Sequence, residues 1–360
     1  LDRPPVPHEP VGQVVEQSRV CGQFTGSPKI VGVPCNPTPE VPRPDTVDHD
    51  TGSEGFYFGS TQTQPQHKIM GLQLYNNRVL RAGTELAQIG QVGGGSVIHH
   101  NVFAMGALTW KDPFQPWQDN ASQLGPREGS VSVHHNIYIG GAESMINLHP
   151  VEWSGDVHQD GDLVHYHDNY FSHGRNAAGT YIGKFSNGKT TYRFENNTFR
   201  KMVFTYDEIG PGKNPPGNFF GVFHLQTNPI EMLNNTWDAL NPLIKPAPNV
   251  VDSGNVNSTS EPVKFVEGGF FPADFDYFLV EMWAQLSSAN LDQPIQYNPG
   301  DYVMWKGDLY QCIATEPHTN KLPPDHPEIW KPLPAPADDV RLAPDSPYPG
   351  YGLMDTVTGS

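Results

Sequence analysis

Six segments of the chain share one pattern built around an asparagine. Each has an apolar residue three positions before the Asn and an apolar or aromatic residue two positions after it. The segments are LQLYNNRV (72–79), VIHHNVF (97–103), VSVHHNIY (131–138), VHYHDNYF (164–171), YRFENNTF (192–199) and IEMLNNTW (230–237). The shared asparagines are Asn77, Asn101, Asn136, Asn169, Asn197 and Asn235. Their unequal intervals of 24, 35, 33, 28 and 38 residues exclude a regular propeller or helical repeat and favour stacked β coils with variable loops.

Strand alternation predicts which way the side chains of these segments point. The two apolar columns share one face of a strand, so stacked coils would place them inside as continuous ladders. The Asn side chains would then hydrogen-bond from coil to coil at one corner. The composition agrees, because 36 Gly and 36 Pro among 360 residues disfavour long helices and supply many turns. The sequence therefore predicts an all-β chain.

This pattern resembles the right-handed parallel β-helix (solenoid) proteins over roughly residues 50–280. The segments SEGFYFGS (53–60) and TELAQIG (84–90) are similar to phrases found inside such helices. The superfamily is dominated by polysaccharide lyases, glycoside hydrolases and phage tailspikes. The resemblance implies a right-handed parallel β-helix that acts on, or adheres to, a polysaccharide.

A second stretch, 297–333, resembles the small chitin-binding type of carbohydrate-binding module, families 5 and 12. The matching elements are Tyr297, Gly300-Asp301, Val303, Gly307, Tyr310, the His318-Thr319 turn and Trp330. The resemblance implies a small β-hairpin module near the C-terminus, with Trp305 as its best exposed contact to carbohydrate. The segment DDVRLAPDSPYPGYG (338–352) is similar to the closing phrase of many β-helix proteins.

We therefore divide the chain into four parts: a proline-rich arm (1–49), the parallel β-helix (50–292), the carbohydrate-binding-like module (293–336) and a C-terminal return segment (337–360). In the arm, Cys21 and Cys35 bracket a predicted hairpin and are the pair expected to form a disulfide, which requires an oxidising compartment. This favours a secreted or cell-surface protein. We expect either that further coils precede Leu1 or that the arm caps the helix.

Alternation also predicts an outward line of polar side chains. His99, His134 and His167 occupy it and lead into Glu195, with His165 and Arg193 beside them. One interpretation is a structural stack of imidazoles. The other is a catalytic groove, in which His134 and His167 transfer protons, Arg193 pairs with a uronate or sulfate, and Glu195 with Asp168 offers the carboxylates of a hydrolase.

Other polar and aromatic residues flank this predicted groove. His149 and His224 would form a polar edge on the second strand of their coils. Trp110 and Trp117, next to and within the long loop 111–129, would stack on sugar rings or pack within their own loop. The loop 155–162 gathers Asp156, Asp160 and Asp162, which would hold Ca²⁺ or form a solvated acidic turn. The predicted proton-transfer chemistry requires no cofactor.

The net charge of the chain disfavours some classes of binding partner. A formal net charge of −17 disfavours nucleic-acid binding, and no apolar run is long enough for membrane insertion. Two function classes remain. The first is an extracellular enzyme that binds and cleaves an extended, anionic or neutral polysaccharide by lyase or hydrolase chemistry. The alternative is a non-catalytic β-helix, such as a tailspike-like adhesin, a filament or a homo-oligomeric assembly subunit.

Overall fold

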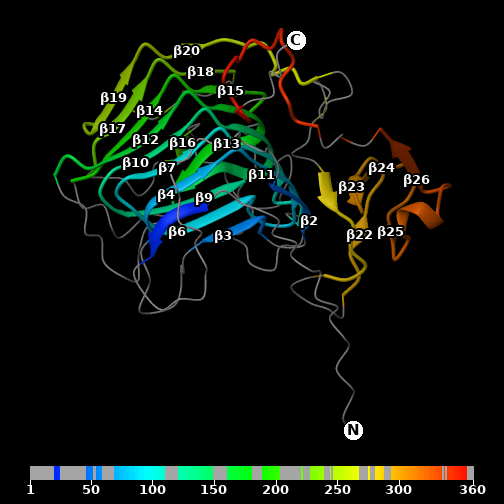
Figure 1. The fold of residues 1–360 in the computed structure, drawn as a ribbon. Coiled ribbons are helices and arrows are strands. Elements are labelled where there is room, and N and C mark those ends of the chain that lie inside the picture. The colour runs from blue at the N-terminus through cyan, green and yellow to red at the C-terminus, as the bar shows by residue number, and fades with distance from the viewer. Residues whose placement is uncertain are drawn as a thin grey trace.

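A computed structural model describes most of the repeat region and the C-terminal third of the chain (Figure 1). The described residues are 20–24, 46–51, 54–58, 69–109, 121–148, 160–180, 189–202, 220–221, 228–238, 244, 246–266, 275, 280–287, 293–334, 336 and 339–354. Over these residues the protein is all-β and contains no α-helix. The structure also shows, within the same ranges, no helix of the length and apolarity needed to cross a membrane.

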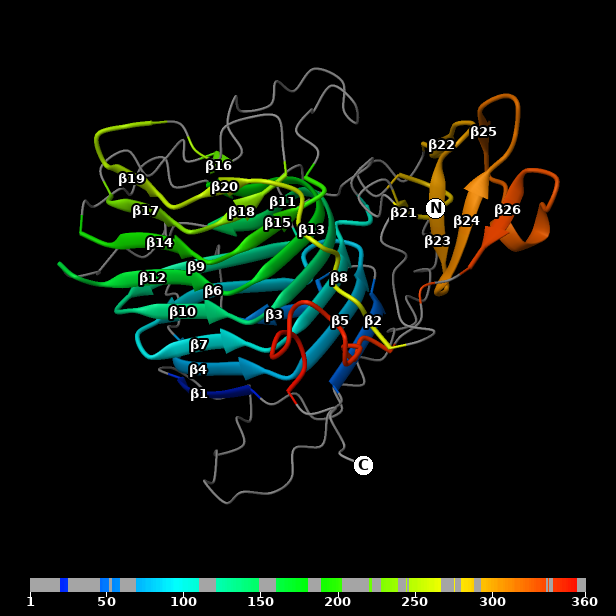
Figure 2. The same ribbon diagram turned by 90° about the horizontal axis from the view of Figure 1, so that it is seen from above.

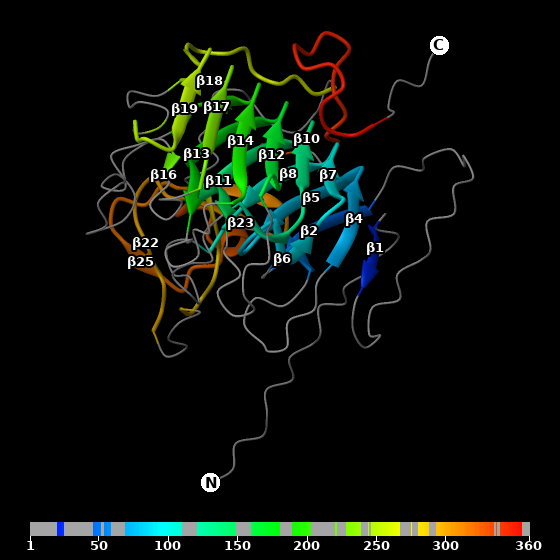
Figure 3. The ribbon, with the colours of Figure 1, turned by 90° about the vertical axis from the view of Figure 1, so that its left-hand side faces the viewer.

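Strands β1 to β20 form one curled 20-stranded sheet whose parallel strands stack in three rows, A, B and C. Row A comprises β4 (Ile69–Tyr75), β7 (Ser96–His99), β10 (Val131–His134), β12 (Leu163–His167), β14 (Thr191–Glu195), β17 (Ile230–Leu233) and β19 (Val250–Ser253). Successive row A strands pair in parallel and in one register. Figure 3 shows these strands lying side by side. The six segments found in the sequence thus pair as predicted.

Rows B and C continue each repeat beyond its Asn corner. Row B contains β2 (Thr46–Thr51), β5 (Asn77–Ala82), β8 (Val102–Gly106), β15 (Thr198–Arg200), β18 (Thr236–Trp237) and β20 (Val256–Asn257). Row C contains β3 (Phe56–Phe58), β6 (Ala87–Gly93), β9 (Ser122–Glu128) and β16 (Phe220–Gly221). The long strands β11 (Ile137–Leu148) and β13 (Tyr170–Thr180) run through both rows. This arrangement is compatible with a parallel β-helix.

Two features of the stack were missed in the sequence. Residues 250–257 form a seventh repeat, with β19, β20 and Asn255 at its corner. The stretch interpreted as one long loop, 111–129, contains strand β9, which pairs in parallel with β6. Strand β9 has a Pro and a Gly in its SQLGPRE sequence, and these residues masked its strand character.

The predicted Asn column forms a continuous hydrogen-bonded ladder. Each side-chain Nδ2 donates to the Oδ1 of the Asn in the next repeat, from Asn77 to Asn255, over 2.8–3.1 Å. The residue before each Asn has a positive φ, between 51° and 69°. This left-handed residue turns the chain from row A into row B, and the Asn amide satisfies the main-chain groups at the turn.

The apolar columns fill the interior as predicted. The column three residues before each Asn is buried from Leu74 to Met232. In the column two residues after it, the rings of Phe103, Tyr138, Phe171 and Phe199 stack face to face with centroids 4.7–5.0 Å apart. Trp237, at the same position one repeat later, is only partly buried because the stack is near its end.

The arm contributes two described strands at the opposite end. Strand β1 (Val20–Phe24) pairs antiparallel with β4, and β2 pairs in parallel with β5. Both cover edges of the first full repeat, which is the capping that an open sheet edge requires. Cys21 lies in β1, but its side chain and the whole of Cys35 lie outside the described residues, so the predicted disulfide stays a prediction.

A separate four-stranded sheet lies beside the stack, as Figure 2 shows. It consists of β21 (Val280–Met282), β23 (Tyr302–Trp305), β24 (Asp308–Cys312) and β26 (Trp330–Leu333), and it is accompanied by β22 (Gln296–Tyr297), β25 (His318–Thr319) and the 3-10 helix η3 (Pro323–Asp325). Trp330 and Tyr310 are buried, as expected for structural residues. Met304 and Leu309 instead pack in one cluster with the outer side of row B, so the small sheet is docked on the stack.

Candidate functional site

The outward face of row A carries three files of side chains that run across the strands. File 1 stands four residues before each Asn and contains Ser132, His165, Arg193 and Glu231. File 2 stands two residues before it and contains Tyr75, His99, His134, His167 and Glu195. File 3 stands directly before it and contains Asn76, His100, His135, Asp168, Asn196 and Asn234. The register of β4, β7, β10, β12, β14 and β17 aligns all three.

File 2 is a stack of rings. Tyr75 lies on His99 at 5.1 Å, His99 on His134 at 5.1 Å, and His134 on His167 at 4.8 Å between ring centroids, all nearly parallel. These separations equal the spacing of neighbouring strands, so the sheet itself sets them. The predicted outward line of His99, His134 and His167 is therefore present in the structure.

File 3 adds two histidines, His100 and His135, that were not predicted from the sequence. His100 and His135 stack at 5.0 Å, and each contacts its file 2 neighbour through Nδ1: His99 with His100 at 2.7 Å, and His134 with His135 at 2.9 Å. One ring of each pair carries a proton on Nδ1 and the other accepts it. The signal was the repeated dipeptide in IHHN and VHHN, where the second His takes the left-handed position before the Asn.

The C-terminal return segment lies against file 3. The Gly352 amide donates to the His135 carbonyl at 2.8 Å, and the Tyr351 ring lies 5.3 Å from the His135 ring. Gly352 has φ +66°, and a Cβ there would lie 2.9 Å from Ile137, so a glycine suits this close approach. File 3 is thus partly covered, while files 1 and 2 face outward beside it.

Burial favours the uncharged form of His99, His100, His134 and His165 near neutral pH. It lowers the pKa of His134 to about 3, and the neighbouring His167 and His99 act in the same direction. Burial and the nearby His99 and His135 lower the pKa of His100 to about 4. The pKa values of His99 and His165 are also lowered, chiefly by burial. The lowered pKa values also make His134 and His100 weak proton acceptors near neutral pH, because a general base works best with a pKa close to the working pH.

Charged partners adjoin the imidazoles on the next two strands. His165 Nε2 lies 3.1 Å from Glu195 Oε2, and Arg193 Nε donates to Glu231 Oε2 at 2.5 Å. All four side chains are between one fifth and about one third exposed. The four predicted catalytic residues His134, His167, Arg193 and Glu195 therefore lie on one face, within three neighbouring repeats.

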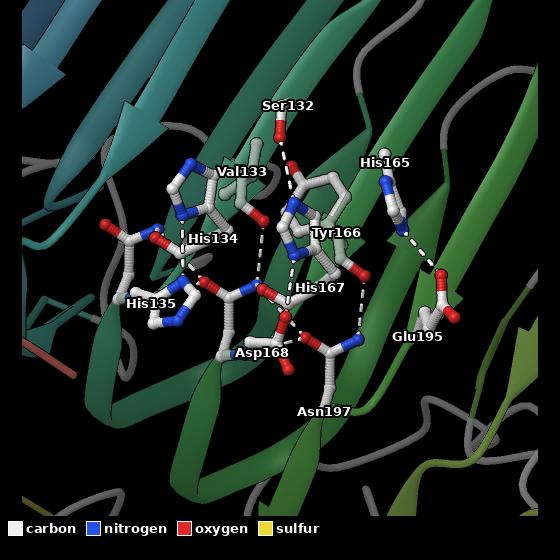
Figure 4. A network of polar contacts seen from close by, with 12 residues as sticks. Ser132, Val133, His134, His135, His165, Tyr166, His167, Asp168, Glu195 and Asn197 are labelled. Carbon is white, nitrogen blue, oxygen red and sulfur yellow. Dashed lines mark hydrogen bonds and ion pairs between the residues drawn. The ribbon is translucent and has the colours of Figure 1, made fainter. Parts of the chain in front are cut away.

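Two consecutive side-chain contacts link file 1 to file 2 and file 2 to file 3 (Figure 4). Ser132 Oγ lies 3.1 Å from His167 Nε2, and His167 Nδ1 lies 2.8 Å from Asp168 Oδ2. Ser132 is not among the residues predicted from the sequence. Its position four residues before Asn136 was a usable signal, because it places Ser132 in the same file as His165 and Arg193.

Several predicted residues lie outside the described part of the chain. They are His149, His224, Trp110, Trp117 and Asp156. Of the other two acidic loop residues, Asp160 is exposed and Asp162 accepts a hydrogen bond from the Gly129 amide at 3.0 Å. No cluster of three or more His, Cys, Asp or Glu able to hold a metal ion occurs among the residues that the structure describes.

Trp305 lies apart from this face, on the docked small sheet. It is half-buried, its ring meets that of Trp283 edge-on at 5.1 Å, and the Lys306 ammonium lies 5.4 Å from its centre. Comparison of the chain with family models, with curated proteins and with solved structures finds no match.

Proposed function

We propose that the chain is a right-handed parallel β-helix that binds and cleaves an extended polysaccharide on the outward face of row A. The observation that supports this most is the file of stacked rings from Tyr75 to His167, with the His165 and Glu195 pair beside it. A polymer needs a long array of similar contacts, and stacked strands repeat one every 4.8 Å or so.

The proposed chemistry is proton transfer by side chains. In lyase chemistry a file 2 imidazole takes a proton from a sugar ring carbon, the glycosidic C–O bond breaks as a C=C bond forms, and the protonated imidazole returns the proton to the leaving oxygen. In hydrolase chemistry Glu195, when protonated, donates to the leaving oxygen while the Asp168 carboxylate takes a proton from the attacking water. Arg193 donates a hydrogen bond to Glu231. It recognises a substrate carboxylate or sulfate when that group replaces Glu231 as its acceptor. These steps require no cofactor.

The surrounding parts fit the same proposal. The small sheet with Trp305 serves as an accessory carbohydrate-binding module, and the protein acts outside the cell or on its surface. The acidic charge of the chain, −17, disfavours nucleic acid as the polymer.

The test is incubation of the full chain with a panel of uronate-containing and neutral polysaccharides. Absorbance of unsaturated products reports lyase chemistry, and new reducing ends without that absorbance report hydrolysis. Binding to a polymer with neither product would show that the protein is a non-catalytic β-helix, such as an adhesin or an assembly subunit. Failure of every polymer to bind would remove the polysaccharide from the proposal.

A further inference from the structure

The arrangement of Ser132, His167 and Asp168 has the order that activates a serine. The nucleophile and base lie 3.1 Å apart, and the base lies 2.8 Å from an orienting carboxylate. Both distances are within the reach that a nucleophile, a general base and its orienting group need. None of these contacts is a consequence of the Asn ladder, because all three side chains point away from the interior.

Asp168 determines the proton positions on His167. A carboxylate only accepts hydrogen bonds, so His167 must donate from Nδ1. The Nε2 of the neutral ring then has no proton and can only accept, and the Ser132 hydroxyl is the donor to it. Ser132 is thereby held with its proton directed at a base, which is the state that precedes attack.

The neighbouring repeats lack this combination. His134 occupies the file 2 position one repeat earlier, but its Nδ1 partner is His135 and the file 1 residue of the preceding strand is Val97. In the repeat after His167, file 2 holds Glu195 in place of a histidine. Among the described repeats, a hydroxyl, an imidazole and a carboxylate meet only once. Ring stacking recurs from repeat to repeat, whereas this combination of three groups occurs at one place.

We infer that Ser132 is the nucleophile of an acyl-ester hydrolase, with His167 as its base and Asp168 as a positioning residue. Ser132 Oγ attacks the ester carbonyl carbon while its proton passes to His167 Nε2. That proton then goes to the departing alkoxide, which leaves as an alcohol. Water, deprotonated by His167, attacks the acyl-serine and releases the carboxylic acid with Ser132 restored.

The substrate class follows from the setting. The His167 and Asp168 side chains are 23% and 31% exposed, so the group to be cleaved is presented from the solvent side. Arg193 stands two strands beyond Ser132 in file 1, where its guanidinium pairs with Glu231. A short acyl group, such as acetyl, on a hydroxyl of a bound carbohydrate fits this face, and this assignment of the carbohydrate rests on the proposed function.

The experiment uses the full chain and two probes that need no knowledge of the polymer. Diisopropyl fluorophosphate, followed by mass spectrometry of the peptides, reports an activated serine, and p-nitrophenyl acetate reports ester hydrolysis. We expect stoichiometric labelling at Ser132, loss of label and of hydrolysis in Ser132→Ala, and no change in Ser258→Ala. Ser258 is the control because it is an exposed serine outside the three files, directly after strand β20.

The variant Asp168→Asn tests whether Asp168 positions His167 or is needed for the fold. Asn occupies the same left-handed position in other repeats, at Asn76, Asn196 and Asn234, so the backbone tolerates it. An amide can donate to Nδ1 and so favours the wrong tautomer of His167. We expect labelling to slow by about 10³–10⁴-fold near neutral pH, with the pH dependence of labelling altered and the melting temperature retained.

Absence of label from the wild-type chain, label at another serine, or unchanged hydrolysis in Ser132→Ala would each overturn the inference. The proposed function is tested separately by depolymerisation of unacylated polysaccharide, which Ser132→Ala should leave intact. Depolymerisation without labelling rejects the serine nucleophile alone. Labelling without depolymerisation or binding rejects the polysaccharide but retains the esterase.

Discussion

His134 and His167 lie face to face across two neighbouring strands, with ring centroids 4.8 Å apart and planes inclined by 20°. Charging either ring would place a cation against its neighbour and against further imidazoles, those of His99, His100 and His135. The stack is therefore stable only while most of its rings are neutral.

This relationship predicts a loss of stability in mild acid. An unfolded histidine binds a proton below its ordinary pKa of 6.5, whereas folded His134 and His100 do so only near 3 and 4. Between these values the unfolded chain binds more protons, so the free energy of unfolding falls as the pH falls from 6.5. Melting temperatures measured at pH 7.5 and pH 5.0 should show the decrease.

The double variant His100→Asn with His135→Asn is the control for acid sensitivity. It keeps a residue type that the left-handed position accepts elsewhere, and it removes two of the rings. The titratable groups that remain around the site are His99, His134, His165, His167, Asp168, Glu195 and Tyr351. Burial and the nearby Asp168 raise the pKa of Tyr351. The double variant should lose less melting temperature in acid, and an equal loss would show that other groups cause it.

The stacked aromatic rings inside the sheet predict that removing one of them lowers the stability of the fold strongly. Phe171 is fully buried between Tyr138 and Phe199. Phe171→Ala should lower the free energy of unfolding by about 3–5 kcal/mol, because it removes the ring and leaves a cavity. Denaturant unfolding measures this, with Val256→Ala, at a residue 52% exposed, as the control of small effect. A near-neutral Phe171→Ala would reverse the assigned inside and outside columns.

The Asn ladder predicts that the loss of stability on removing an Asn depends on where that Asn lies in the stack. The Asn169 side chain donates to the Val133 and His167 carbonyls and to Asn197, and accepts from Asn136. Asn169→Ala should destabilise the fold by at least about 2 kcal/mol, because several buried partners lose a hydrogen bond. Asn255→Ala, at the partly exposed end, should cost clearly less since water replaces the lost contacts. Equal costs in chemical denaturation would argue against a cooperative ladder.

The catalytic interpretation predicts activity loss without unfolding. On a polymer that the protein cleaves, His134→Ala, His167→Ala and Arg193→Ala should each lower kcat/KM by at least about 100-fold. Stability should change little, because these outward positions leave no core cavity. Arg341→Ala, which breaks the exposed ion pair with Asp339, is the control. Intact activity with a large drop in melting temperature would identify the file as a structural stack.

The docked module predicts a separate binding contribution. Trp305→Ala should reduce the fraction of the full chain pulled down by an insoluble polysaccharide, since its half-buried ring is the aromatic surface offered there. Ile313→Ala, at a residue 48% exposed in the same module, should leave the bound fraction unchanged. Binding that persists unchanged in Trp305→Ala would place the carbohydrate contact elsewhere.

The sequence by itself determined the repeat, its register and the direction of its side chains. Strand alternation and the Asn column are local properties, because an Asn that must meet its copy in the next repeat fixes every neighbour relative to it. The inward Phe171, the outward His134 and the parallel pairing of six segments followed from these properties alone. Residues with weak patterns, such as the Pro-containing strand β9 and the exposed repeat around Asn255, were missed.

Only the tertiary structure decided which chemical groups meet. Ser132 and His167 are 35 residues apart, and their contact depends on the strand spacing and on the side-chain torsions across two repeats. Tyr351 reaches His135 because the chain returns to the stack after the small sheet, and Met304 packs on row B because both surfaces are apolar. A periodic pattern specifies stacking between equivalent positions, whereas diagonal contacts between files and contacts between non-repeating segments depend on the folded geometry.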